Sequence, residues 1–541
     1  MRITAVRPLL LAVSLGILGS AILSAGGTRS AVPGHPDDKT IVHVLNRIGF
    51  GPTPEDVERI RQAGLARYID QQLQPEKIAD AGMTARVAAF TTLQKSTAEL
   101  AQNYFLPALM ERRRAARAQG GTAMEAPDAA AKRVPRTPEA RAAMMQEREV
   151  LSELAQQKIL RAAYSERQLE EVMVDFWFNH FNVFAGKGVT RLYLTAYERD
   201  AIRPHVLGKF RSLLGATAES PAMLFYLDNW QSSAPDGTVA VDRRRSFRRP
   251  AGAAPVKARP RGLNENYARE LMELHTLGVD GGYTQKDVQD VARAFTGWTI
   301  TAPRQGGSFR YEPRMHDDGA KVVLGHRLPA GGGQKDGERV LDILASHPAT
   351  SRFVATKLVR RFVADEPPAA LVERAAARFR ETDGNIREVV RTIVTSPEFF
   401  APAAYRAKVK TPFEFVASTV RATAFDTPNA LPLVKAMRDL GMPLYFCQPP
   451  TGYADRAEAW VNTGALLNRM NFAVAMTQGG TRGRAAGSPP SAAGLEAARD
   501  TLSRNVMADD VSESTRATVA RATEAPQAVA LLLGSPELQR K

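Results

Sequence analysis

The sequence predicts a mainly α-helical fold: a multi-helix globular domain with a small β-hairpin and two disordered basic insertions. Long stretches at 66–110, 139–180, 350–400 and 410–440 have the residue pattern of helices. Strand signals are few, and the segments 309–311 and 321–324 are expected to pair as one hairpin. The apolar fraction of 44% and the charged fraction of 24% are typical of a globular protein rather than a disordered or membrane-embedded one.

Four helix-start signals mark where individual helices begin. Residues 53–56 combine a threonine cap, a proline at the first helical position and acidic residues in the first turn. Residues 165–168 and 284–287 have the pattern of a capping box. Asn385 and Glu388 are expected to cap a further helix that ends before Pro397.

The N-terminus has the pattern of a secretory signal peptide. Arg2 and Arg7 make a short positively charged n-region. Residues 9–23 are apolar or small, and small residues follow at 24–27. The apolar run is short for a bilayer span, although an uncleaved N-terminal anchor is the alternative. We therefore expect cleavage near Gly26 and a periplasmic or secreted protein.

The predicted organisation places one large helical domain between short terminal segments. The expected parts are a signal peptide at 1–26, a linker at 27–40, a helical domain at 41–476 with flexible insertions at about 112–141 and 231–262, a flexible segment at 477–510, and a C-terminal helical segment at 511–541 that packs on the main domain.

The net charge of +15 is concentrated in the two insertions. Residues 241–262 carry +7 and residues 112–141 carry +5, so the rest of the chain is close to neutral. Both stretches are rich in alanine, proline and glycine and lack hydrophobic periodicity. They are either solvated loops without a partner or sites that attract anionic surface polymers or lipid headgroups. With an export signal present, we expect no nucleic-acid partner.

Cys447 is the single cysteine of the chain. The sequence therefore excludes an intramolecular disulfide, a thiolate metal cluster and a covalently attached c-type haem. It leaves the identity of any cofactor or metal unknown.

A polar row in the segment 263–298 is the first candidate site. This segment is predicted to form a helical hairpin, and Asn266, Glu270 and Glu273 lie along one edge of the apolar stripe of its first helix. Glu270 and Glu273 are candidate catalytic acids or bases, and Asn266 is a candidate binding residue. The alternative is a solvated face held by ion pairs of Arg269 with Glu265 and Glu273.

The aromatic segment 175–184 is the second candidate site. His180 lies among five aromatic residues, on the helical face of Met173 and Trp177, with Asn179 and Asn182 as candidate binding residues. His180 is either a hydrogen-bonded core residue or a catalytic general base oriented by a neighbouring amide or carboxylate.

Two weaker candidates contain histidines outside these segments. His205 follows Arg203 and Pro204, and His316 precedes Asp317 between the two expected strands. A His–Asp pair is common in acid–base sites, but neighbouring residues of a strand point to opposite faces. His205, His316 and Asp317 are therefore candidate binding residues only.

The chain resembles the domain of unknown function 1800 family over residues 41–476 and at its C-terminal end. The similarity lies in ordered blocks: HVLNRIGFGPTP at 43–54, DFWFNHFN at 175–182, IRPHVL at 202–207, PAMLFYLDNW at 221–230, NENYARELMELHTLGVDGG at 264–282, HDDGAKVVLG at 316–325, KVKTPFEF at 408–415 and PTGYADRAEAWVNTGALLNRMNF at 450–472. The resemblance implies an exported helical protein whose genes often neighbour those of a sulfatase-like family. It implies no established activity.

Two functional hypotheses follow from the residues. The first is an extracytoplasmic hydrolase or lyase that acts on a surface polymer, with His180, Glu270 and Glu273 in one polar cleft. The second is a non-catalytic export, assembly or scaffold factor that binds a secreted partner such as the sulfatase-like protein through an exposed apolar face.

Overall fold

The computed structural model describes residues 30–118, 137–234, 262–477 and 499–541. The expected signal peptide at 1–26 and most of both basic insertions lie outside these residues, so their predictions stay predictions. Within the described residues no helix is both long enough and apolar enough to cross a membrane.

The mainly α-helical fold is confirmed. The N-terminal part contains α1 (Asp38–Arg47), α2 (Asp56–Ala63), α3 (Leu65–Gln72), α4 (Ala81–Val87), α5 (Thr97–Leu100), α6 (Leu106–Ala118) and α8 (Pro138–Tyr164). The middle contains α9 (Gln168–His180), α10 (Thr190–Ala196), α11 (Phe210–Glu219), α12 (Pro221–Tyr226), α14 (Glu265–Glu273), α15 (Gln285–Ala294), α16 (Lys335–Ser346) and α17 (Pro348–Phe362). The C-terminal part contains α18 (Ala369–Glu381), α19 (Ile386–Val394), α20 (Pro412–Ala422), α21 (Leu431–Asp439), α22 (Thr463–Thr477), α24 (Glu513–Ala520), α25 (Ala525–Leu533) and α26 (Pro536–Gln539).

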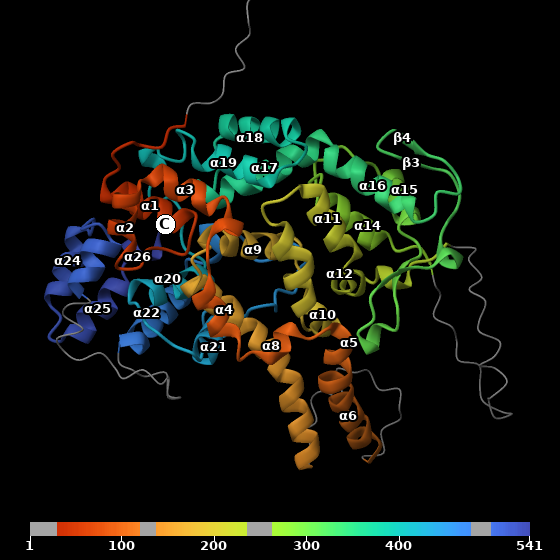
Figure 1. Cartoon of the computed structure of the whole chain (residues 1–541), viewed down its shortest axis with the longest axis horizontal. Helices are drawn as coiled ribbons and strands as arrows, with labels where there is room; N and C mark the ends of the chain where they lie inside the picture. The colour runs from red at the N-terminus through yellow and green to blue at the C-terminus, as the bar shows by residue number, and fades with distance from the viewer. Residues whose placement is uncertain (1–29, 119–136, 235–261, 478–498) are drawn as a thin grey trace, which may run out of the picture.

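One continuous apolar core connects these helices, from Ile41 in α1 to Leu538 in α26. The C-terminus lies close to the beginning of the folded chain, because α26 and α1 line the same small pocket (Figure 1). An isolated antiparallel bridge between Val409 and Arg540 attaches the C-terminal residues to the segment before α20. The C-terminal helices therefore pack on the main body.

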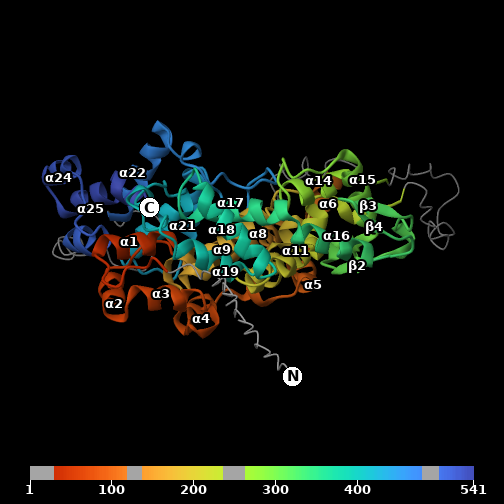
Figure 2. The ribbon, with the colours of Figure 1, turned by 90° about the horizontal axis from the view of Figure 1, so that it is seen from above.

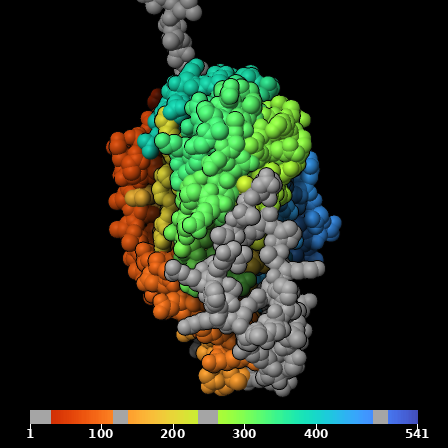
Figure 3. All heavy atoms as spheres, turned by 90° about the vertical axis from the view of Figure 1, so that its right-hand side faces the viewer, coloured from red at the N-terminus to blue at the C-terminus, as the bar shows by residue number. Residues whose placement is uncertain are grey.

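The molecule is elongated and flat (Figure 2). The helices α24 and α25 lie at one end, and α15, α16 and the strands lie at the other end, which faces the viewer in Figure 3. The antiparallel helices α6 and α8 project from the body as a hairpin (Figure 1). The helix α9 lies near the middle of the molecule, where it contacts α3 and α8, and His180 at its end lies beside Phe353 of α17.

The predicted pairing of the two strands is wrong, although both strands exist. The strand β2 (Phe309–Tyr311) pairs with β1 (Trp298–Ile300), and β3 (Lys321–Val323) pairs with β4 (His326–Leu328), both antiparallel. Leu324 and Gly325 join β3 to β4 with φ values of 49° and 80°. Two consecutive residues of positive φ make the tight turn that suits a two-residue hairpin, so β3 pairs with its nearest neighbour.

The helix-start predictions have mixed outcomes. Thr284 and Asp287 form the expected capping box, and the Asn385 side chain caps α19. The capping box at 165–168 is wrong: the Ser165 hydroxyl donates to Asp80 Oδ2 at 2.7 Å, and α9 begins at Gln168. The helix expected from 53–56 starts at Asp56, whose carboxylate accepts the Thr53 N–H.

Candidate functional site

A cavity of about 310 Å³ lies beside α9. Its walls come from the C-terminal half of α9, the last turns of α17 and the loop between α21 and α22. The lining residues are Asp175, Phe176, Asn179, His180, Lys357, Arg360, Arg361, Thr411, Met442, Thr451, Gly452, Tyr453, Ala454, Asp455 and Arg456. This volume is at the lower end of the range for small-ligand sites.

Two asparagines of the aromatic segment hold one wall of this cavity. The Asn179 side chain donates to the Tyr453 carbonyl at 2.8 Å and accepts the Tyr453 N–H at 2.7 Å. The Asn182 amide donates to the carbonyls of Cys447 and Pro449 at 2.9 and 2.8 Å. The structure therefore uses both predicted binding asparagines to fix the loop 447–453 against α9.

Gly452 is required by this close packing. Its φ is +73°, and a Cβ at this position would lie 2.2 Å from the Asn179 carbonyl oxygen. Only glycine combines that backbone conformation with such an approach. The sequence blocks 175–182 and 450–472, which are far apart in the chain, thus form one packed unit.

His180 is buried in this unit, with 2% of its surface exposed. Its Nε2 lies 3.0 Å from the carbonyl oxygen of His275, just after α14, so Nε2 carries the proton and donates. Burial lowers the pKa of His180 well below its usual value, and the nearby Lys357 ammonium acts in the same direction. The ring is therefore neutral, and its Nδ1 is an acceptor that has no partner among the described residues.

Lys357 and Arg360 supply the positive charge of the cavity. They are one helical turn apart on α17 and therefore share a face. Lys357 forms no hydrogen bond or ion pair within the described residues, and its Nζ lies 5.5 Å from the centroid of the Phe353 ring. Burial lowers the pKa of Lys357 to about 8, although the Asp455 carboxylate partly opposes this shift.

The other charged groups of the cavity are already paired. Arg361 is paired with Glu414, and Arg456 Nη1 lies 2.8 Å from Glu366. Among the acids, Asp175 lies 2.9 Å from Lys158 Nζ and Asp455 lies 3.1 Å from Lys408 Nζ. Arg360 donates only to the Asp365 backbone carbonyl, at 3.1 Å. Within the described part of the chain, the cavity thus has two cations without a carboxylate partner, Lys357 and Arg360.

The polar row of α14 lies outside this cavity. Glu273 accepts a hydrogen bond from the Tyr283 hydroxyl at 3.1 Å, and the half-buried Glu270 has its pKa raised by burial and by Glu273. Asn266 is exposed at the start of α14. Among the described residues no hydrogen bond joins His180 to Glu270 or Glu273, and α9 meets this part of the chain through the His275 carbonyl. The structure therefore does not bring the three predicted catalytic residues together.

The remaining candidates belong to other contacts. His316 is buried with Nδ1 2.8 Å from the Thr296 carbonyl and Nε2 3.3 Å from Asp336. Asp317 accepts two hydrogen bonds from Arg293, at 2.9 and 3.0 Å. His205 is half-buried in a short turn, where burial lowers its pKa. None of the three lines the cavity.

Sequence reasoning missed the two cations of α17. The stretch 350–400 predicts a helix, and on an amphipathic helix a lysine and an arginine suggest a solvated face. The sequence gives the loop residues Tyr453 and Asp455 no role beyond their place in the block 450–472 that resembles the family. A helix pattern alone does not show which cations face a cavity.

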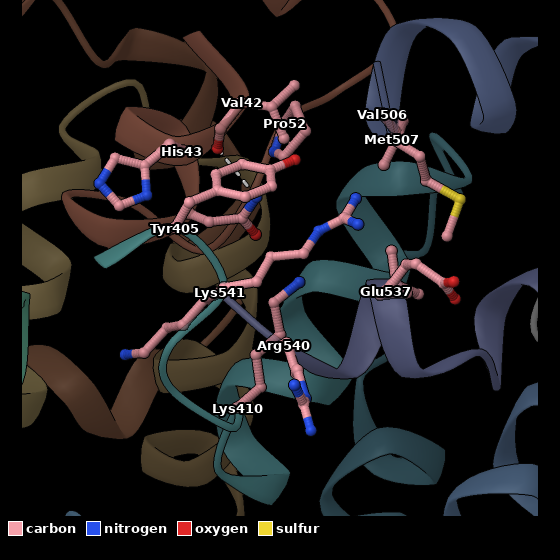
Figure 4. Close-up of a pocket in the computed structure, with 13 residues that line it drawn as sticks. Val42, His43, Pro52, Tyr405, Lys410, Val506, Met507, Glu537, Arg540 and Lys541 are labelled. Carbon is pink, nitrogen blue, oxygen red and sulfur yellow. Dashed lines mark hydrogen bonds between the residues drawn. The ribbon is translucent and has the colours of Figure 1, made fainter. Parts of the chain in front are cut away.

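A second, much smaller pocket lies where α1, the segment 405–410 and the C-terminal residues meet (Figure 4). Its volume is about 10 Å³, enough for one water molecule. In the close-up the side chains of Arg540 and Lys541 diverge from each other. The His43 Nε2 donates to the Phe399 carbonyl at 2.8 Å. This pocket is too small for an organic ligand.

Within the described residues no group of three or more His, Cys, Asp or Glu side chains is placed to hold a metal ion.

Comparison with known proteins identifies the family. The model of a family described as protein of unknown function (DUF1800) matches residues 43–540. Because this match covers most of the chain, the chain belongs to this family, as the sequence blocks predicted. No curated protein and no solved structure matches the chain.

Proposed function

We propose that this member of the DUF1800 family is an extracytoplasmic lyase that acts on an acidic unit of a surface polymer. The observation that carries this proposal is a pair of cations, Lys357 and Arg360, on one wall of a cavity of about 310 Å³, where neither has a carboxylate partner among the described residues. A carboxylate is the ligand that neutralises such a pair. The extracytoplasmic location rests on the N-terminal sequence.

The pKa of Lys357 suits it to the role of base. With a pKa of about 8, about a tenth of this amine is neutral at pH 7, whereas an ordinary lysine is almost wholly protonated. A base is most effective when its pKa lies near the working pH. Arg360 stays charged and holds the substrate carboxylate, which makes the neighbouring C–H more acidic.

The proposed reaction is a β-elimination. The Lys357 amine takes the proton from the carbon next to the carboxylate, and the C–H electron pair becomes a C=C double bond. The C–O bond to the next polymer unit breaks, and its oxygen takes a proton from water. The reaction needs no oxidant and no co-reactant.

A lyase fits this cavity better than a hydrolase. Glycoside hydrolysis commonly uses two carboxyl groups, one of which acts as a proton donor. Both carboxylates of the cavity are in ion pairs, Asp175 with Lys158 and Asp455 with Lys408. Within the described part of the chain, the charged groups of the cavity that have no ion-pair partner are Lys357, the proposed base, and Arg360.

The test is an assay on a panel of uronate-containing polysaccharides, read by the ultraviolet absorbance of the unsaturated product. Lys357→Met should lower turnover by roughly a hundredfold, and Arg360→Gln by at least about tenfold. Arg352→Gln is the matched control, because Arg352 is on the same helix but is exposed and paired with Glu373. Absence of an unsaturated product from every polymer would overturn the lyase assignment.

A second candidate function is favoured by the surface of α22. Leu466, Leu467 and Val474 are 41%, 60% and 37% exposed, and Val461 just before the helix is 47% exposed. The only charged residue of α22, Arg469, is buried. Such an uncharged apolar face suits a protein partner, and the sulfatase-like exported protein is the partner that family membership suggests.

This alternative predicts a different response to mutation. Leu467→Asp should abolish recovery of a partner in a pull-down from native periplasm, while Lys357→Met should leave recovery unchanged. If wild-type protein recovers no partner, the assembly-factor function is contradicted.

A further inference from the structure

We propose that the anion bound in the cavity also carries a hydroxyl group that donates a hydrogen bond to Nδ1 of His180. The ligand is then a hydroxy acid of the sugar-acid kind. This inference rests on the proposed anionic substrate and deepens it, because it adds a second group that the ligand must have.

The direction of the hydrogen bond follows from the protein side. The His275 carbonyl can only accept, so its contact with Nε2 at 3.0 Å fixes the proton of His180 on Nε2. The other nitrogen, Nδ1, then presents a lone pair. His180 lines the cavity, is 2% exposed, and its Nδ1 has no hydrogen-bond partner in the described residues.

Within the described residues no donor is hydrogen-bonded to Nδ1. The His275 ring lies 6.2 Å from the His180 ring, measured between centroids. The rings of Trp177 and Phe181 lie 5.3 and 4.5 Å from the His180 ring, and Phe176 and Phe353 lie 6.4 and 6.1 Å away, as measured between ring centroids. Lys357 is close enough to affect the His180 pKa but forms no hydrogen bond with it. A buried acceptor without a partner is costly, so a donor that enters from the cavity gains free energy there.

The chemistry of the pocket restricts the ligand further. Lys357 and Arg360 attract one carboxylate, whereas Nδ1 repels a second one because both groups present lone pairs. A hydroxyl group satisfies Nδ1, and an apolar ligand leaves it unpaired. The pocket should therefore prefer a hydroxylated monocarboxylate over a dicarboxylate or an unsubstituted ring acid.

The test compares two ligands with the same six-membered ring size and charge. D-galacturonate carries hydroxyl groups, and cyclohexanecarboxylate does not. Calorimetric titration of the full chain should show galacturonate binding about tenfold more tightly, the typical value of one buried neutral hydrogen bond. In ¹⁵N-histidine spectra, galacturonate should shift the Nδ1 resonance of His180, and cyclohexanecarboxylate should leave it in place.

Variants separate this inference from the proposed function. His180→Phe should bind both acids equally, and Lys357→Met should lose both. If His180→Phe does not fold, the Nδ1 resonance of the wild-type protein still decides the question. Equal binding of the two acids by wild-type protein would overturn the hydroxyl inference and leave the anion site standing. Binding of neither acid would overturn the anion site itself, and the inference with it.

Discussion

Two lysine–histidine clusters of this protein differ in the burial of the lysine and in the pairing of their polar atoms: Lys321 is buried and Lys357 is half-buried. In the first, Lys321 Nζ lies 2.7 Å from Asp336, 2.9 Å from the Gly319 carbonyl and 2.5 Å from the Asp317 carbonyl. Both nitrogens of His316 also have partners there. In the second, Lys357 has no such partner among the described residues, and His180 uses one nitrogen of two.

This difference separates a structural cluster from a candidate site. We call the cluster of Lys321 and His316 saturated, because its side-chain nitrogens already have partners, and the cluster of Lys357 and His180 unsaturated. The saturated cluster holds β3 and the preceding loop against α16. The unsaturated cluster lines a cavity, and its half-buried lysine has no ion-pair partner among the described residues, which costs stability and is a common sign of a functional site. Pairing, more than residue type, therefore distinguishes the two clusters.

The largest expected effect is in the saturated cluster. Lys321→Met should lower the free energy of unfolding by about 3 kcal/mol, because it leaves the buried Asp336 carboxylate without its cation. Urea unfolding followed by circular dichroism measures this change. A loss below about 1 kcal/mol, the size expected of a surface pair, would show that the cluster does not act as a buried one.

The equivalent substitution in the unsaturated cluster should act in the opposite direction. Lys357→Met should raise the free energy of unfolding at pH 7 by about 1 kcal/mol, because it removes a poorly solvated charge that has no direct ion pair within the described residues. The folded pKa of Lys357 is about 8, below the ordinary value of 10.5. The wild-type penalty is therefore complete below pH 8 and disappears as the pH rises toward 10.5.

Thermal unfolding at pH 7 and pH 10 tests this sign. The advantage of Lys357→Met should be present at pH 7 and much reduced at pH 10. A variant less stable than wild type at pH 7 would mean that Lys357 has a stabilising partner, and the two clusters would then be alike.

The sequence predicted local structure better than it predicted contacts between distant segments. The capping box at Thr284 and Asp287 depends on residues three apart, and the structure confirms it. The two strands were located correctly, but each has a different partner from the one expected. Periodicity identifies the apolar face of an element and leaves open which element covers that face.

The same limit explains the outcome for the candidate site. The aromatic segment with His180 does line a cavity, as its density of polar groups among aromatics suggested. The opposite wall is formed by α17 and the loop at 442–456 rather than by the polar row of α14. Lys357 differs from an ordinary surface lysine through its partial burial and its lack of an ion pair among the described residues, and both are properties of the folded chain.

The smallest expected effect at pH 7 concerns His275, the neighbour of His180. Burial lowers the pKa of His275 to about 3, from an ordinary value of 6.5. The folded state keeps this ring neutral while the unfolded state takes up a proton below pH 6.5. The stability that His275 contributes is therefore present above pH 6.5 and is lost as the pH falls toward 3.

His275→Gln removes this dependence and keeps the backbone carbonyl that His180 uses. At pH 7 its stability should stay within about 1 kcal/mol of wild type. Between pH 6.5 and 4.5 the variant should lose less stability than wild type, as measured by urea unfolding at several pH values. His326→Gln, at an exposed position, is the control and should follow the wild-type slope. If the stability of His275→Gln depends on pH as that of wild type does, His275 is protonated in the folded protein. The unsaturated cluster then does not keep its imidazole rings neutral at acidic pH.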